Sequence, residues 1–344
     1  MSSFAAAMER RHRTQIFEKI LLESPERLPH SPKPAIVASA AAPASPLLPV
    51  GRLSYPESRN QAMRAMRHGD FEAAIALIAS TLAAGAVSDL PAASVFELRI
   101  LQAEALRRAE RSAEALEVLD EAETLLQGGI QAAWLPQQVD LLQARAAVSV
   151  SLGDFTRAEA ELVEAVNLCE RDERNASRLC RLYRDLAKVY LASGHESDAI
   201  GIIVDGLALL EGESVANPGE KMALLQLLAG ITHQQGACTT AASHLLDAYR
   251  VAQEADRQDE MAHLEAILGT LYAQHGDDEA ARQWLTAAVA RLEACGGEPG
   301  CRLALLYTSL AQVETRLGLE EAAETFTRAV ALQLRFLNST CPLN

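Results

Sequence analysis

Small and apolar side chains recur along the chain at helical spacing, on either side of short polar turns. Within Leu271–Ala294, the residues Ala281, Leu285 and Ala288 lie on one side of a helix with about 3.6 residues per turn. Gly276 precedes them, and glycine readily adopts the left-handed conformation that ends a helix. The two residues after it are aspartates, which favour the start of the next helix. The pattern predicts two antiparallel helices joined at Gly276.

Six further copies of this pattern precede or follow it, at spacings of 40 to 43 residues. The turn positions are Gly69, Glu110, Gly153, Gly194, Gly236, Gly276 and Gly318. Seven residues before each turn the side chain is small: Ala62, Ala103, Ala146, Ala187, Ala229, Gly269 and Ala311. Five residues after each turn it is alanine: Ala74, Ala115, Ala158, Ala199, Ala241, Ala281 and Ala323. We therefore expect close crossing of the two helices in every pair, because small residues allow the backbones to approach.

The larger positions follow the same period. Nine residues after the turn the first six copies have Ile or Leu, whereas the last copy has Thr327. Twelve residues after the turn the middle copies are small, but the end copies have Thr81 and Val330. Atypical end copies are common in repeat proteins, where they cap the array.

This arrangement of a small residue, a turn glycine, an alanine and a leucine resembles the tetratricopeptide repeat (TPR). The resemblance covers roughly Pro56–Phe336. Its period, near 42 residues, is similar to the long variant found in kinesin light chains and in sensor domains of MalT-type bacterial regulators. One copy departs from the pattern, since Glu110 replaces the turn glycine. The resemblance implies an all-α fold, a right-handed α-solenoid of about seven helix-turn-helix repeats. The residues before the repeats add a disordered N-terminal extension.

Four segments follow from the same pattern. We expect a tail over residues 1–24, for which a short amphipathic docking helix is the alternative, and a flexible Pro/Ala-rich linker over residues 25–56. The solenoid is expected over residues 57–337 and a C-terminal tail over residues 338–344.

The charge is divided unevenly between these segments. Residues 1–59 carry eight Lys or Arg and five Asp or Glu, whereas the remaining residues carry 23 and 41. The residues after 59 are therefore strongly acidic and repel nucleic-acid phosphates and anionic membranes. No nucleic-acid partner is expected. Charged or amide side chains interrupt every apolar run, so no membrane span is predicted. Arginines stand where a secretory signal would be apolar, which favours a cytoplasmic protein.

Catalytic and metal-binding motifs are missing from the sequence. It contains no phosphate loop, no dinucleotide-binding glycine pattern, no nucleophile elbow, no Cys-x-x-Cys and no His-Glu-x-x-His. We expect neither an enzyme nor a cofactor. Cys169, Cys180 and Cys238 are interpreted as small apolar residues, and a disulfide between Cys295 and Cys301 is disfavoured by a cytosolic setting.

The resemblance also implies where a partner binds, because in TPR proteins the first helix of each pair lines a concave groove. The groove-facing positions of TPR repeats, counted back from each turn residue, predict ten polar groove residues in this chain: Arg107, Arg108, Arg181, Arg184, Lys188, Gln226, His233, His263, Gln274 and Gln312. Arg181, Arg184 and Lys188 lie on successive turns of one helix and form a basic stripe. We hypothesise that this stripe, with the first two arginines, holds carboxylates of an acidic peptide or of a partner's C-terminus. The alternative is that these side chains pair with acids of neighbouring repeats.

Three functions remain open at this point. The first is a non-enzymatic scaffold that binds a peptide or partner segment in the groove. The second is a regulatory sensor, in which a small molecule or signalling peptide occupies a polar pocket around His233, His263, Gln274 and Gln312. The third is a secretion or assembly chaperone that uses the N-terminal segment as a recruitment tag.

Overall fold

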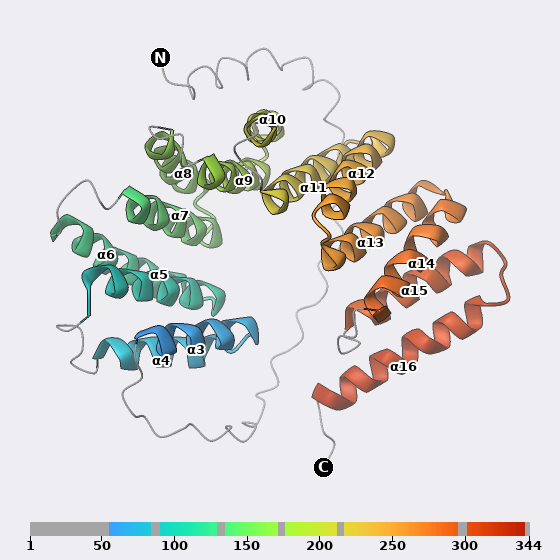
Figure 1. The fold of residues 1–344 in the computed structure, drawn as a ribbon, viewed down its shortest axis with the longest axis horizontal. Coiled ribbons are helices and arrows are strands. Elements are labelled where there is room, and N and C mark those ends of the chain that lie inside the picture. Colours follow the sequence, from blue (N-terminus) through green and yellow to red (C-terminus); the bar gives the residue numbers. More distant parts are fainter. Residues whose placement is uncertain are drawn as a thin grey trace. The chain divides into compact units, whose positions relative to one another are not determined.

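The computed structural model describes residues 55–83, 90–128, 135–170, 176–211, 217–294 and 301–340. These residues form fourteen α-helices, and no strand occurs among them (Figure 1). The first begins at Tyr55 and the last ends at Thr340, a little outside the predicted limits of the solenoid. The predicted tail at 1–24, nearly all of the linker, the segment around Cys295 and the last four residues lie outside the described part.

The helices fall into two compact units that divide between His195 and Glu196, within the fourth repeat. In the first unit each helix packs on the next in the chain. Its helices are α3 (Tyr55–Arg67), α4 (Phe71–Ala83), α5 (Ala92–Arg108), α6 (Ser112–Gly128), α7 (Leu135–Ser151), α8 (Phe155–Cys169) and α9 (Ala176–Ala192).

The second unit is built in the same way, with each helix packed on the next. Its helices are α10 (Glu196–Leu210), α11 (Pro218–Gln234), α12 (Cys238–Glu254), α13 (Gln258–His275), α14 (Asp278–Ala294), α15 (Cys301–Arg316) and α16 (Ala322–Thr340). The helices α13 and α15, which open successive repeats, also contact each other.

All seven predicted turn residues have a positive φ. The six glycines have φ between 71° and 85°, and Glu110 has φ 62°. The backbone N–H of the residue after the turn donates to a carbonyl five residues earlier, as in Arg111 to Leu106 and Asp277 to Tyr272. The turn prediction is therefore confirmed in every copy, including the one that lacks glycine.

Replacement of Glu110 by glycine is expected to stabilise the protein. The left-handed conformation costs an L-residue about 1–2 kcal/mol. Glycine removes that cost, while its freedom in the unfolded chain takes back about 0.4–1 kcal/mol. We expect the urea midpoint to rise for Glu110→Gly. It is not expected to rise for Glu110→Ala, because alanine keeps the Cβ atom. A Glu110→Ala variant as stable as Glu110→Gly would show that φ is not the cause.

The small positions lie where the helices of a pair cross. The seven residues that precede the turns by seven positions are all buried, and so are six of the seven alanines that follow it. Ala323 is the exception and is exposed. Its helix α16 begins two residues later, relative to the turn, than α14 does, and turns a different face toward α15. The expectation of close crossing at Ala323 is therefore wrong.

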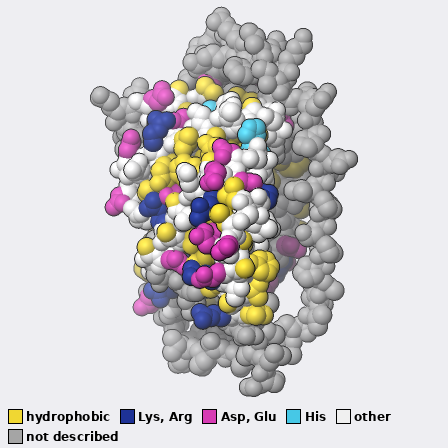
Figure 2. Space-filling model, turned by 90° about the vertical axis from the view of Figure 1, so that its right-hand side faces the viewer, with side chains coloured by type: hydrophobic (Ala, Val, Ile, Leu, Met, Phe, Trp, Pro, Cys, Tyr) yellow, Lys and Arg dark blue, Asp and Glu magenta, His cyan; other side chains and the backbone are white. Residues whose placement is uncertain are grey.

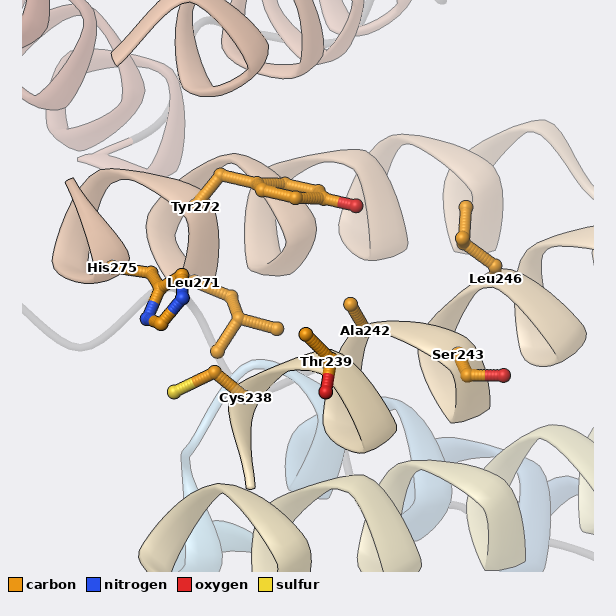
Figure 3. A pocket seen from close by; sticks show the side chains of 8 residues that line it. All are labelled: Cys238, Thr239, Ala242, Ser243, Leu246, Leu271, Tyr272 and His275. Atoms are coloured by element: carbon orange, nitrogen blue, oxygen red, sulfur yellow. The ribbon is translucent and has the colours of Figure 1, made fainter. Parts of the chain in front are cut away.

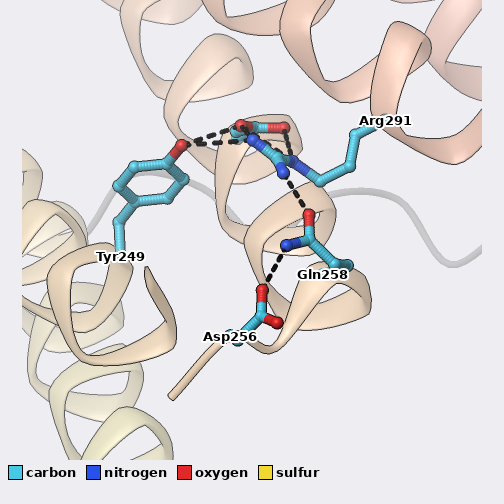
Figure 4. Close-up of polar contacts among 5 residues, drawn as sticks. Tyr249, Asp256, Gln258 and Arg291 are labelled. Carbon is cyan, nitrogen blue, oxygen red and sulfur yellow. Dashed lines mark hydrogen bonds and ion pairs between the residues drawn. The ribbon is translucent and has the colours of Figure 1, made fainter. Parts of the chain in front are cut away.

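A buried ion pair joins three helices of the second unit (Figure 4). Glu265 of α13 is only 1% exposed, and Arg291 of α14 donates to both of its oxygens, at 2.7 Å and 3.0 Å. Tyr249 of α12 also donates to Glu265, at 3.0 Å. The carboxylate raises the pKa of Arg291, and burial followed by the hydrogen bond raises that of Tyr249. The second helices of two repeats thus meet on one carboxylate between them.

Charges of both signs are intermixed on the face drawn in Figure 2, with hydrophobic side chains between them. Many of the arginines in the described part pair with nearby carboxylates. Arg316 binds Asp278 at 2.6 Å, and Arg111 binds Glu72 at 3.0 Å, each bridging consecutive repeats. Some of the acidic side chains are thus neutralised locally by arginines.

Candidate ligand-binding site

A pocket of about 530 Å³ lies in the second unit between the first helices of three successive repeats. We call it the three-helix pocket, because α11, α13 and α15 supply most of its wall and α12 supplies the rest. Its lining residues are Gln226, Ala229, Gly230, His233, Ala241, Leu245, His263, Ala266, Ile267, Thr270, Leu271, Gln274, Arg302, Leu305, Leu306 and Ser309. A pocket of this size and mixed polarity is typical of ligand sites.

Four of the predicted groove residues line this pocket together. Gln226 and His233 come from α11, and His263 and Gln274 come from α13. Gln312 of α15 is exposed and does not line it. The equivalent positions of two repeats therefore contribute polar groups to the same pocket.

Sequence reasoning missed the charged group of the pocket. Arg302 lies sixteen residues before the turn at Gly318, which is outside the register positions used for the groove. The side chain reaches the pocket because α15 begins at Cys301 and crosses beside α13. The periodic pattern carries no signal for it.

Burial and the nearby Arg302 lower the pKa of His263. A lowered pKa favours the neutral imidazole at pH 7, which offers one donor and one acceptor. His233 has a weak contact of 3.9 Å between its Nδ1 and the Sγ of Cys238. The polar groups of the pocket are thus suited to hydrogen bonding at neutral pH.

The first helices of the first unit bind each other instead. Arg59 of α3 meets Glu97 of α5 at 3.6 Å, and Gln143 of α7 donates to Asp185 of α9 at 2.5 Å. Arg178 donates to the carbonyl oxygen of Pro136 at 2.8 Å. By contrast, no hydrogen bond or ion pair joins α11, α13 and α15 to one another among the residues that the structure describes. The first helices around the three-helix pocket are therefore not tied to one another by polar side chains in the described part.

No protein-family model matches the chain, and no curated protein is similar to it in sequence. Solved structures share its fold. A signal transduction ATPase with numerous domains from Pyrococcus horikoshii, which has a tetratricopeptide repeat sensor, gives a TM-score of 0.60 at 13% identity. That match covers 82% of this chain and 42% of the other. The apo form of RapI gives 0.60 at 11% identity, over 81% of this chain and 76% of the other.

A third structure is a Rap protein complexed with Competence and Sporulation Factor. It gives a TM-score of 0.50 at 14% identity, over 83% of this chain and 78% of the other. The chain has a TPR-like repeat fold. Identities this low show the fold alone, so the comparison establishes the TPR-like architecture.

The basic stripe of this TPR-like chain faces a carboxylate on its own helix. Asp185 lies 3.2 Å from Arg184 and 3.8 Å from Lys188, and it also accepts the hydrogen bond from Gln143. Arg181 makes no hydrogen bond or ion pair within the described residues, although its charge acts to lower the pKa of Asp140, which burial raises. The stripe is therefore partly neutralised before any partner binds.

Arg107 and Arg108 share one acid of the same helix. Their Nε atoms donate to Glu104 at 2.8 Å and 2.6 Å. Burial alone would raise the pKa of Glu104, but these two hydrogen bonds hold it below its usual value. The predicted alternative, pairing with acids, thus has direct support here, although the acid belongs to the same helix rather than to a neighbouring repeat.

A smaller pocket of about 230 Å³ lies between α12 and α13 (Figure 3). Its polar groups come from five residues: Cys238, Thr239, Ser243, Tyr272 and His275. Leu271 lines both this pocket and the three-helix pocket. Cys238 is half-buried, whereas Cys169 and Cys180 are buried as expected for small apolar residues.

Neither a metal-binding cluster nor a membrane-spanning helix occurs within the described residues. No group of three His, Cys, Asp or Glu side chains there is placed to hold a metal ion. No helix in the same part of the chain is both long and apolar enough to cross a membrane.

Proposed function

We propose that this TPR-like chain is a non-enzymatic binding protein that takes a peptide or a partner segment in the three-helix pocket. One observation carries the proposal. The inner helices of the first unit bind each other through polar side chains, whereas no hydrogen bond or ion pair joins α11, α13 and α15 to one another around the pocket, among the described residues. Side chains that are not used to hold the fold are available to hold a ligand.

The chemistry of the lining suits an extended peptide. Gln226 and Gln274 each offer an amide donor and an amide acceptor, which match the backbone groups of a bound segment. Leu305 is 61% exposed, which is unusual for a large apolar side chain, and Ile267 is half-buried. Together they offer an apolar surface for a ligand side chain.

A regulatory sensor is the second candidate, and the volume of the pocket favours it. About 530 Å³ falls within the range that small-molecule sites occupy, about 300–1,000 Å³. Two proteins of the same fold point the same way, since one carries a tetratricopeptide repeat sensor and the other is complexed with Competence and Sporulation Factor. The chaperone alternative rests on the N-terminal segment, which lies outside the described residues.

An acidic partner at the basic stripe remains a separate proposal. Arg181 supports it, because this arginine has no ion pair among the described residues. Asp185 counts against it, because this carboxylate already binds Arg184 and Lys188, the other two residues of the stripe. An Arg184→Glu variant that retains full affinity for a captured partner would exclude the stripe from the interface.

Thr270→Trp is expected to block the pocket and to weaken partner binding by about tenfold or more. Thr270 is exposed on α13 and lines the pocket, so the larger ring fills the space without entering the core. Affinity capture from the native cell extract identifies the partner, and titration calorimetry measures the loss.

Thr286→Trp is the matched control, because Thr286 is an exposed threonine on α14, outside the pocket. Circular dichroism verifies that both variants remain folded. If Thr270→Trp captures the same partner as strongly as Thr286→Trp does, the interface lies elsewhere and the proposal fails. If neither captures a protein, but a small-molecule fraction of the extract stabilises the wild type and not Thr270→Trp, the chain is the sensor.

A further inference from the structure

The three-helix pocket contains a cation but no acid. Arg302 is the only Lys or Arg among its lining residues, and neither Asp nor Glu occurs there. The protein as a whole carries a net charge of −15. A pocket without carboxylates is therefore a local exception on an acidic chain, and it favours an anionic group of a ligand.

Arg302 is not used to hold the fold together. Other arginines of the second unit have acid partners, such as Arg291 with Glu265 and Arg316 with Asp278. The guanidinium of Arg302 makes no hydrogen bond or ion pair within the described residues, and the side chain is exposed. It also stands in the first turn of α15, where the helix dipole disfavours a positive charge. Neither local helix stability nor pairing accounts for its position.

His263 lies close enough to Arg302 for the arginine charge to help lower its pKa. One side chain comes from α13 and the other from α15, so two repeats contribute nitrogen donors to the lining of the pocket. A carboxylate accepts hydrogen bonds from a guanidinium in a bidentate manner and from an imidazole N–H at a further lone pair. The Arg302 guanidinium and the His263 imidazole can therefore donate to the same carboxylate at once.

An apolar surface lies beside these donors. Leu305 follows Arg302 by three residues, and Ile267 follows His263 by four, so each apolar side chain shares a helix face with a donor. A ligand with a carboxylate next to an aliphatic group meets both surfaces at once. Burial of Leu305 by such a group removes exposed apolar area from water.

We infer that the three-helix pocket selects a carboxylate borne on an aliphatic group, with Arg302 and His263 as its donors and Leu305 and Ile267 as its apolar contact. The ligand has two chemical sources, the C-terminus of a peptide that ends in an aliphatic residue or a free aliphatic acid. The inference rests on the proposed function only in taking the pocket as the binding site.

N-acetyl-leucine and N-acetyl-leucinamide test the inference, because they differ only in the carboxylate. The full-length protein with ¹³C-labelled histidine reports binding through the ring signal of His263. We expect saturable binding of N-acetyl-leucine and about tenfold or more weaker binding of the amide. Arg302→Gln is expected to remove that difference, whereas Arg250→Gln, at an exposed arginine of α12 outside the pocket, keeps it.

Hexanoate separates the two sources. If N-acetyl-leucine binds more tightly than hexanoate, the peptide amide contributes and a peptide C-terminus is the source; equal affinities indicate a free acid. Equal binding of N-acetyl-leucine and its amide overturns the selection for a carboxylate, and so does the absence of binding by every probe. Failure of the proposed function is seen separately, as partner capture that Thr270→Trp does not reduce.

Discussion

Arg291→Ala is expected to destabilise the second unit by about 3–5 kcal/mol, because it leaves a buried carboxylate without its counter-ion. Glu265 is 1% exposed and receives three hydrogen bonds from the Arg291 guanidinium, at 2.7, 3.0 and 3.1 Å. Without them, Tyr249 is the remaining donor to Glu265 among the described residues (Figure 4). The measurement is urea unfolding followed by circular dichroism, with hydrogen exchange of α13 and α14 to locate the loss.

The matched control is Arg316→Ala, since Arg316 also binds one carboxylate through two nitrogens but is 46% exposed. A much smaller effect is expected there, because water screens an exposed pair. The double variant Arg291→Met/Glu265→Gln removes both charges and is expected to recover much of the lost stability. If Arg291→Ala unfolds at the same urea concentration as Arg316→Ala, Glu265 reaches water and the buried pair does not stabilise the unit.

Gly269→Ala is expected to destabilise the unit by about 1–3 kcal/mol through overpacking where α13 crosses α14. A Cβ atom at this position would lie 2.6 Å from Cγ and 3.1 Å from the backbone nitrogen of Leu285. The leucine side chain has little room to move, because it is fully buried. Alanine favours a helix over glycine by about 1 kcal/mol, and the steric cost is expected to exceed that gain.

Gly230→Ala separates these two effects. Gly230 is also in a helix, α11, but a Cβ atom there meets nothing within 4 Å. We expect this variant to be more stable than the wild type, since only helix propensity changes. Thermal unfolding of both variants measures the difference, and a Gly269→Ala protein as stable as Gly230→Ala would show that the two helices separate at little cost.

The repeat architecture was predictable because its determinants lie close together in the sequence. Each helix pair is specified by a small residue, a turn residue and an alanine within thirteen consecutive positions, and the pattern recurs seven times. Even Glu110 follows the turn pattern, with φ 62°. A left-handed turn and a close crossing impose their requirements on particular positions, so these requirements are visible in the residues themselves.

The site was predictable only in part. Register placed Gln226, His233, His263 and Gln274 on the first helices of two repeats, and the structure brings all four into one pocket. Arg302 was missed and Gln312 is excluded from the lining. Which side chains of neighbouring repeats meet depends on the angle and offset between repeats, and no local pattern encodes those.

The sequence by itself determined that this chain is a helical-repeat protein, where its turns lie and, except at Ala323, which small residues are buried between helices. Only the tertiary structure decided which polar groups are used up and which remain available. It pairs Gln143 of α7 with Asp185 of α9, buries Glu265 of α13 against Arg291 of α14, and leaves Arg302 without a partner in the described part. The physical reason is that pairing depends on distances between side chains of separate turns and helices, which packing alone sets.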